Sequence, residues 1–335
     1  MEQINRLYRH YEEDGCVFKT CFDYVVILRK QHDTITNEER SDVMDAKHAK
    51  FRGSHFLVEL IFDKNDPTKT IDTIKNSVCH HCIVTYTVGE ITKADTFDTN
   101  IDKICASGIH YFKSLSAAFY YKYDFYSIKN HHKDTECLIY DDNGTMTFKL
   151  NYINGKCQGD RLEYHPNGKL KSTSKYDDGV CNSEYLEYHQ NGQLKLKYYY
   201  VDNLRSGDYL EYHYNGNLKI TCNYIDGKYN GEYLSYYTDG ALKVKCNYVN
   251  GKLKGEWYEY YNDGKLKDKS NYVNGRLHGP CQTYYPNGDI EYECNYKYGE
   301  CDGLYSHYSE NRRIHKIGII KNGCNLREIP EYYVL

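Results

Sequence analysis

The sequence predicts an α+β domain over residues 1–130, then an all-β array of antiparallel hairpins over residues 137–324, with a C-terminal cap or tail over residues 325–335. Two repeated signals support this prediction. A tyrosine recurs every 24 residues from Tyr152 to Tyr296, and Asn-Gly or Asp-Gly pairs between β-rich runs recur with the same period. A fixed short period is typical of a tandem array, and Asn-Gly between such runs is a strong hairpin signal. We therefore expect one elongated, twisted sheet built from copies of one hairpin.

Each repeat is expected to contain two strands and two kinds of turn. The turn at Asp239-Gly240 and its equivalents should be a two-residue type I′ turn, which needs positive φ at both central residues. This register would place Tyr236 opposite Lys243. The other connection, over residues 224–231, is expected to be a longer glycine-bearing turn. Both faces of such a sheet carry aromatic or aliphatic groups, so the pattern does not choose the buried face.

The segment before the array has no such period and favours an α+β fold. Residues 38–50 have a helical composition, and residues 56–62 and 82–88 are apolar runs typical of strands. Ser114 suits the N-cap of a short helix. A polar run over residues 127–134 lies outside the repeat register and predicts the boundary between the two parts.

Composition narrows the classes of function. The 335 residues include 43 basic and 47 acidic side chains, so no global positive field favours nucleic acid or acidic lipid. No run approaches the ~20 apolar residues of a membrane-spanning helix, and the first residues lack the apolar core of a signal peptide. We therefore expect a cytoplasmic protein whose 14 cysteines are thiols. No phosphate loop, serine elbow or metalloprotease motif occurs, so we expect neither an enzyme nor a cofactor.

A second tyrosine column provides the candidate binding surface. Its members occupy one place in successive copies: Tyr164, Tyr188, Tyr212, Tyr236, Tyr260 and Tyr284. We expect these rings to hold one hairpin to the next, and a protein partner to use the same rings, because tyrosine is a frequent contact residue at interfaces.

Two neighbouring columns suggest structural roles instead. The residue after each column tyrosine is histidine in some copies, such as His213, and tyrosine in others, such as Tyr237. This exchange indicates half-buried rings and argues against metal ligands. A lysine column, exemplified by Lys219, and a glutamate column, exemplified by Glu211, are expected to pair on a solvated face.

The N-terminal segment contains one candidate metal site. Cys79, Cys82, Cys105 and His110 could provide the thiolate and imidazole ligands that zinc prefers. Such a module would use the array as a targeting arm. The alternative is that the cysteines are plain thiols and that His110 donates to a backbone carbonyl. Cys105 with His110 could also be a nucleophile and its base, but sequence spacing does not define such a pair.

Residues 248–257 and their equivalents resemble MORN repeats, in the 24-residue variant found in bacterial antitoxin-like and giant-virus proteins. The resemblance covers about residues 137–324 and recurs in every copy, with Asn203 and Ser183 replacing two glycines. The segment from Cys105 to His110 resembles a C-x-x-G-I-H domain of giant-virus proteins. The resemblance implies an interaction scaffold for a protein partner, not nucleic acid, located in the host cytoplasm or the virion if the protein is viral. Membrane association and antitoxin-type binding are the alternatives that it leaves open.

Overall fold

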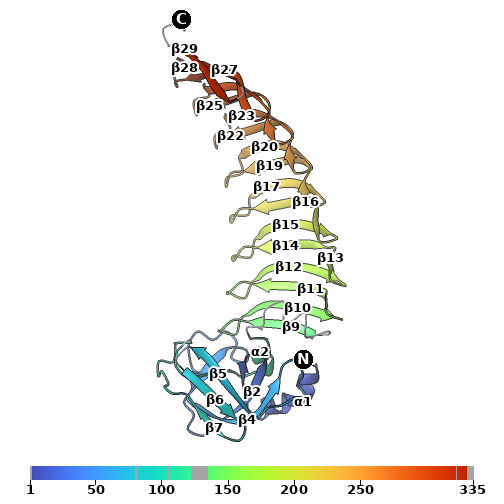
Figure 1. Cartoon of the computed structure of the whole chain (residues 1–335), viewed down its shortest axis with the longest axis vertical. Coiled ribbons are helices and arrows are strands. Elements are labelled where there is room, and N and C mark those ends of the chain that lie inside the picture. The colour runs from blue at the N-terminus through green and yellow to red at the C-terminus, as the bar shows by residue number, and fades with distance from the viewer. Residues whose placement is uncertain (1, 80–81, 105, 122–134, 322, 330–335) are drawn as a thin grey trace. The chain divides into compact units, whose positions relative to one another are not determined.

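The computed structural model describes residues 2–79, 82–104, 106–121, 135–321 and 323–329 (Figure 1). Strands make up 57% of the protein and helices 6%. The chain divides into two compact units, Met1–Val180 and Cys181–Leu335, which we describe in turn. In the described residues, no helix is long and apolar enough to span a membrane.

The first unit contains a six-stranded antiparallel sheet, a separate hairpin and two helices. The sheet has the strand order β3-β8-β1-β2-β4-β7, and β5 pairs with β6. The elements are α1 (Glu2–Glu13), β1 (Val17–Cys21), β2 (Tyr24–Lys30), β3 (Lys50–Gly53), β4 (His55–Asp63), β5 (Thr73–Cys79), β6 (Cys82–Thr87), β7 (Ile91–Lys93), β8 (Ile109–Phe112) and α2 (Leu115–Tyr120).

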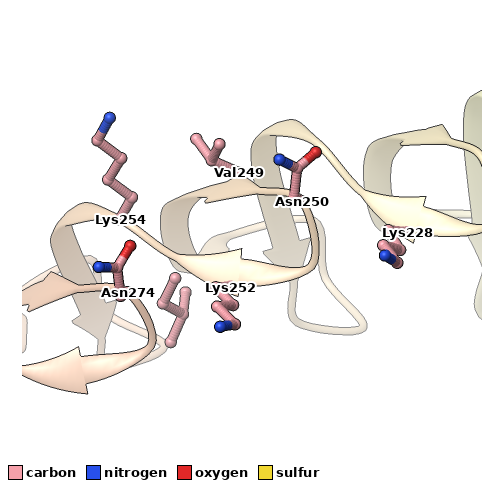
Figure 2. A pocket seen from close by; sticks show the side chains of 7 residues that line it. Lys228, Val249, Asn250, Lys252, Lys254 and Asn274 are labelled. Atoms are coloured by element: carbon pink, nitrogen blue, oxygen red, sulfur yellow. The ribbon is translucent and has the colours of Figure 1, made fainter.

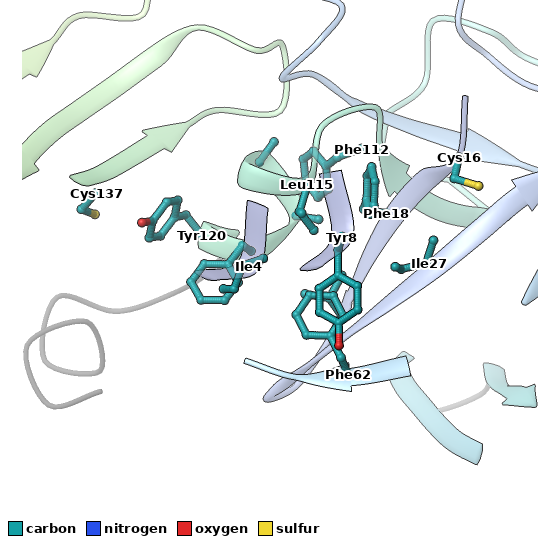
Figure 3. Packing of buried hydrophobic residues seen from close by; sticks show 14 of the residues in the cluster. Ile4, Tyr8, Cys16, Phe18, Ile27, Phe62, Phe112, Leu115, Tyr120 and Cys137 are labelled. Atoms are coloured by element: carbon teal, nitrogen blue, oxygen red, sulfur yellow. The ribbon is translucent and has the colours of Figure 1, made fainter. Parts of the chain in front are cut away.

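Side chains alternate between the two faces of the six-stranded sheet along each strand. Both faces are buried, because each packs into its own hydrophobic cluster. Val25 and Ile27 of β2 join the cluster around the two helices, which Figure 3 shows. Val26, on the opposite face of β2, joins a second cluster. Tyr8 of α1 stacks on Phe62 with ring centroids 4.3 Å apart. The helices therefore cover one face of the sheet, and the loops and the β5–β6 hairpin supply residues to the other.

The structure confirms some of the predicted N-terminal elements and corrects one. β4 and β6 lie where the apolar runs predicted strands, and Ser114 caps α2 by accepting a 3.2 Å hydrogen bond from the Ala117 N–H. The helix predicted over residues 38–50 is wrong, because most of this segment forms turns. Tertiary contacts override its helical composition: the buried Arg40 donates to Asn143, 3.2 Å away, and Lys50 to Asp142, 2.7 Å away. The predicted boundary over residues 127–134 lies outside the described residues.

The first repeats belong to the same compact unit as the N-terminal sheet. Their strands are β9 (Thr135–Tyr140), β10 (Met146–Ile153), β11 (Lys156–Tyr164) and β12 (Leu170–Asp177), each antiparallel to the next. Cys137, Leu150 and Tyr152 are buried in the cluster that also contains α2. The first hairpin therefore completes the core of the N-terminal domain.

The second unit is a meander in which each strand pairs with the next one in the sequence. β13 (Val180–Cys181) lies at the division between the units. β17 pairs with both β18 and β19, because these two strands are pieces of one interrupted strand. The elements are β14 (Glu184–Tyr188), β15 (Leu194–Val201), β16 (Leu204–Tyr212), β17 (Leu218–Ile225), β18 (Lys228–Tyr229), β19 (Gly231–Tyr236), β20 (Leu242–Val249), β21 (Lys252–Leu253), β22 (Gly255–Tyr260), β23 (Leu266–Val273), β24 (Arg276–Leu277), β25 (Gly279–Tyr284), β26 (Ile290–Lys297), β27 (Glu300–Tyr308), β28 (Ile314–Lys321) and β29 (Cys324–Ile329).

The two kinds of turn are the reverse of the prediction. The two-residue type I′ turn lies at the second connection, where Asn250 and Gly251 have φ of 51° and 78° and Val249 pairs with Lys252. At Asp239-Gly240, the φ of Gly240 is 94°. The loop there has three residues, because Tyr237 and Ala241 close it. The Tyr237 N–H donates to the Ala241 carbonyl, and the Gly240 N–H donates to the Tyr237 carbonyl.

The longer loop shifts the strand register. Tyr236 pairs with Leu242 and not with Lys243, because a β-bulge separates this pair from Ser235 and Val244. The Asp239 carboxylate accepts a 3.0 Å hydrogen bond from the Ala241 N–H. An asparagine or aspartate therefore recurs before the turn glycine as a side-chain acceptor for the turn, and not as a residue with positive φ.

The prediction that all cysteines are thiols is wrong for one pair. Cys294 of β26 and Cys301 of β27 form a disulfide. They occupy two columns seven residues apart, and this is the copy that has cysteine in both columns. The equivalent pairs in the preceding copies are Cys222 with Tyr229, Cys246 with Leu253 and Ser270 with Leu277.

Candidate binding surface of the repeat array

The structure places all six candidate tyrosines at the end of a strand, with one residue between each tyrosine and the three-residue loop. Each is half-buried. In β16, for example, Tyr212 pairs with Leu218, and the bulge lies between this pair and the pair of Glu211 with Ile220. The strands that carry the column are β11, β14, β16, β19, β22 and β25. The repeat geometry thus presents one ring in one setting, copy after copy.

A second half-buried group accompanies most of these rings. Residues two apart on a strand share a face, so Leu210 lies on the same face as Tyr212. In β22 the place of this leucine is taken by Tyr258, which stacks with Tyr260 at a centroid distance of 6.3 Å. We call this surface the tyrosine face. In the second unit it comprises Leu186, Tyr188, Leu210, Tyr212, Leu234, Tyr236, Tyr258, Tyr260, Gln282 and Tyr284.

The opposite face contains a self-packed ladder of other tyrosines. The ring centroids of Tyr198 and Tyr209 are 5.9 Å apart, and these two rings are stacked. The centroid of Tyr224 lies 5.5 Å from that of Tyr209 and 4.6 Å from that of Tyr229. Tyr198 and Tyr224 are only 3% and 6% exposed. Arg205 covers Tyr198, with its guanidinium carbon 4.7 Å from the ring centroid. Tyr224, a member of the column that recurs every 24 residues, therefore belongs to a buried cluster on this face. The second tyrosine column lies on the other face.

The column that exchanges histidine with tyrosine ties each repeat to the next. His213 donates from Nε2 to the Tyr236 carbonyl at 3.0 Å, because a carbonyl oxygen only accepts. One repeat later, the Tyr237 hydroxyl donates to the Tyr260 carbonyl at 2.8 Å. Both side chains therefore donate one hydrogen bond to the equivalent backbone carbonyl of the next repeat. This confirms the interpretation of the column as interchangeable rings.

We expect His213→Tyr to change the free energy of unfolding by less than about 0.5 kcal/mol, because the hydroxyl replaces the Nε2 donor. His213→Leu should cost about 1 kcal/mol, since it leaves the Tyr236 carbonyl without its donor. Urea unfolding of the two variants measures both effects. Equal losses for tyrosine and leucine would show that packing, and not the hydrogen bond, holds the repeats together.

The lysine and glutamate columns pair beside the bulges, as expected. Lys219 lies 2.6 Å from Glu211, and Lys267 lies 2.8 Å from Glu259. Lys243 has no glutamate in the equivalent place, and its ammonium lies 5.4 Å from the centroid of the Tyr237 ring. These pairs neutralise charge locally, so they add little attraction for phosphates or lipid headgroups.

In the N-terminal domain, Arg52 holds a long loop together. Its side chain is completely buried and donates to four carbonyl oxygens at 2.7–2.9 Å. The acceptors belong to Asp98, Asn100, Lys103 and Ser107. Arg52 is therefore a structural cation for this loop, and its guanidinium carbon lies 5.2 Å from the centroid of the Phe97 ring.

The four candidate zinc ligands are only partly placed by the structure. His110 donates from Nε2 to the Ile104 carbonyl at 2.9 Å. This is the kind of contact that we expect if His110 is not a metal ligand. Cys105 lies outside the described residues, as do the side chains of Cys79 and Cys82, whose backbones pair in the β5–β6 hairpin. No group of three or more histidine, cysteine, aspartate or glutamate side chains gathers as a metal site among the residues that are described. Zinc binding by these four residues stays a prediction.

The His110 imidazole should give the protein a distinct acid sensitivity. Burial, assisted by the nearby Lys19 ammonium, lowers the pKa of His110 from 6.5 to about 4. Between these values the unfolded chain binds a proton that the folded chain does not, so stability is present above pH 6.5 and falls as the pH drops toward 4. The loss should reach roughly 3 kcal/mol.

Urea unfolding at pH 7 and pH 4.5 tests this expectation. His110→Gln should reduce the difference between the free energies of unfolding at the two pH values. His32→Gln, at a side chain that is 96% exposed, should leave this difference unchanged. Equal pH dependence in the wild type and His110→Gln would contradict the assignment.

Comparison with known protein families finds a match in each part of the chain. Residues 8–118 match the model of a family of unknown function, DUF5758. The array matches the MORN repeat variant in six copies, over residues 158–178, 182–202, 205–226, 229–250, 253–274 and 277–298. The resemblance to MORN repeats is therefore confirmed over these copies.

Two solved structures that match the chain have low sequence identities and low TM-scores. A porin-like protein from Bacteroides uniformis is 12% identical, over 58% of this chain and 87% of that one, with a TM-score of 0.16. The Tc holotoxin pore of Photorhabdus luminescens is also 12% identical, over 89% and 22% of the two chains, with a TM-score of 0.17. A search of curated proteins found no match.

Proposed function

We propose, from the match of residues 158–298 to MORN repeat variants, that this protein is a non-catalytic scaffold whose array binds a protein partner through the tyrosine face. MORN repeats are generally protein or membrane interaction repeats. The recurrence of a half-buried tyrosine at one strand position in six copies carries the proposal. Such rings supply large contact areas that exclude water from an interface.

The setting of these rings favours binding without rearrangement. Each ring projects from a strand that is hydrogen-bonded on both sides, as Tyr236 does from β19. Binding would therefore cost little backbone entropy. The paired lysine and glutamate columns leave no strong field along the strands, so affinity would come from buried aromatic and leucine side chains. We further propose a cytoplasmic location, in the host if the protein is viral, with the virion as the alternative.

Capture from cell extract with the full chain as bait tests the proposal. The test variant combines Tyr212→Thr, Tyr236→Thr and Tyr260→Thr, since threonine keeps the strand propensity and removes the ring. We expect this variant to lose most of the partner that the wild type retains, while its far-ultraviolet circular dichroism spectrum stays the same.

The matched control removes tyrosines that lie on turns. Tyr214 and Tyr298 are 61% and 62% exposed. Tyr214→Thr with Tyr298→Asn should leave capture unchanged; asparagine replaces Tyr298 because it stands at the equivalent turn position in other copies. Equal capture by the test variant and the control would refute a role for the tyrosine face.

A further inference from the structure

The turn edge of the array contains a pocket that the tyrosine face does not share. It has a volume of about 370 Å³ and is lined by Lys228, Val249, Asn250, Lys252, Leu253, Lys254 and Asn274. Figure 2 shows that these residues come from successive type I′ turns. Three of the lining residues are lysines and two are asparagines, whereas none is acidic.

The lysine stems are held in place by the turn of the following repeat. A Cβ added to Gly251 would lie 3.6 Å from the Cβ of Lys228, and one added to Gly275 would lie 3.8 Å from that of Lys252. Each stem therefore packs over the glycine of the next turn. This packing restrains the ammonium groups to the edge of the sheet and lowers the entropic cost of fixing them on a ligand.

These lysines differ from the lysines of the strands in having no counter-ion. Lys219 and Lys267 form ion pairs with glutamates. In contrast, Lys228, Lys252 and Lys254 form no ion pair with any residue in the described part of the chain. Three unneutralised cations at one pocket favour an anionic ligand.

A backbone donor in the same pocket also lacks an acceptor. In four copies, a side chain accepts a hydrogen bond from the first N–H of the next type I′ turn. The acceptors are Gln158, Asn182, Asn230 and His278. Lys254 stands at this place in the pocket and cannot accept. The Asn274 N–H therefore donates to no group among the residues described, and it adds a donor for an anion.

The cationic region is short. On one side, the turns carry Asp202 and Asp226, and on the other side Glu300 and Asp302 replace the basic residues. A continuous anionic surface such as a membrane would meet these carboxylates along with the lysines. A compact anionic segment would meet only the pocket, so the charge distribution favours a ligand about two to three repeats long, or roughly 20–30 Å at ~4.7 Å per strand.

The pocket also has an apolar part. Val249 lines it and is 39% exposed, and Val273 on the next repeat is 40% exposed. We propose that this turn-edge pocket binds an extended peptide segment that contains both acidic and aliphatic residues. The carboxylates would accept from Lys228, Lys252, Lys254 and the Asn274 N–H, and an aliphatic side chain would cover Val249. This site adds to the proposed function and does not depend on the tyrosine face.

Fluorescence anisotropy with the full chain tests the site. The probe is a short fluorescein-labelled peptide of glutamate, leucine and valine, and the control peptide has glutamine in place of glutamate. We expect the wild type to bind the acidic peptide, with affinity that falls as salt rises. Lys254→Asn should weaken binding about fivefold to tenfold, because it removes a charge and restores the acceptor of the other copies.

Lys243→Asn is the matched control, because it removes the same charge from an exposed strand residue of the array. It should leave the affinity unchanged, as should the triple tyrosine variant, so the outcome separates this site from the tyrosine face. Equal binding by Lys254→Asn and Lys243→Asn, or no binding of the acidic peptide, would overturn the proposal. Binding to phosphatidylserine vesicles that depends on Lys254, without peptide binding, would also overturn it by assigning the pocket to lipid.

Discussion

Replacing Arg52 by methionine is expected to lower the free energy of unfolding of the N-terminal domain by about 3–5 kcal/mol. Methionine keeps much of the volume but removes every donor. The carbonyls of Asp98, Asn100, Lys103 and Ser107 would then remain in a buried site without their partners. Arg52→Lys should be nearly as damaging, because an ammonium cannot reproduce the planar fork of a guanidinium. Guanidinium unfolding followed by circular dichroism measures both losses.

Arg9→Met provides the comparison for an exposed arginine. Its side chain is 71% exposed and pairs with Glu13 at 3.2 Å on the surface of α1. Its replacement should cost less than about 0.5 kcal/mol. An Arg52→Met effect of the same small size would mean that the loop over residues 97–108 does not depend on this cation.

Gly144→Ala is expected to destabilise the first compact unit by about 3 kcal/mol or more. The φ of Gly144 is 85°, which disfavours alanine. An added Cβ would also lie 2.8 Å from the Ala49 nitrogen and still closer to the Asp45 carbonyl oxygen. Both neighbours are backbone atoms, so the first hairpin would have to move away from the segment that it packs against.

Gly264→Ala separates the two causes. Gly264 occupies the same place in its turn, with φ of 83°, but an added Cβ would meet nothing within 4 Å. This variant should therefore show only the backbone cost of about 1–2 kcal/mol. If thermal unfolding gives equal losses for the two variants, the close packing of the first hairpin contributes nothing to stability.

Periodicity predicted the array because its signal is repeated. One Asn-Gly pair predicts one hairpin, and a pair in each of six copies predicts a meander of successive hairpins. The sequence predicts the two turn types in the reverse order, since Asn-Gly or Asp-Gly stands at both ends of the hairpin, as at Asp239-Gly240 and at Asn250-Gly251. Composition does not distinguish an asparagine with positive φ from one that caps a turn with its side chain.

Features that depend on contacts between distant segments cannot be predicted from the local sequence. Nothing in the local pattern of Arg40 or Arg52 indicates that these arginines are buried, because the partners are loop and hairpin groups far along the chain. The same applies to α1, whose burial depends on Phe62 of β4. The buried face of the array was undecidable because both faces carry tyrosines, and only the register identifies Tyr198 and Tyr224 as the core.

The disulfide shows the limit of reasoning from column averages. Cysteine exchanges with serine, tyrosine or leucine in its columns, which indicates a small or apolar packing residue. Cys294 and Cys301 combine two such columns in one copy, and the fold brings them within bonding distance. The signal was present in the sequence as a spacing of seven between columns, but it required the bulged pairing of β26 with β27 to become meaningful.

Site-specific photocrosslinking tests the central claim most directly, namely that the tyrosine face is the contact surface. Benzoylphenylalanine would replace Tyr236 in one full-length protein and Tyr298, an exposed turn residue, in another. We predict that, in cell extract, a partner protein is crosslinked from position 236 and not from position 298. Crosslinking of the same partner from position 298 alone would contradict the account.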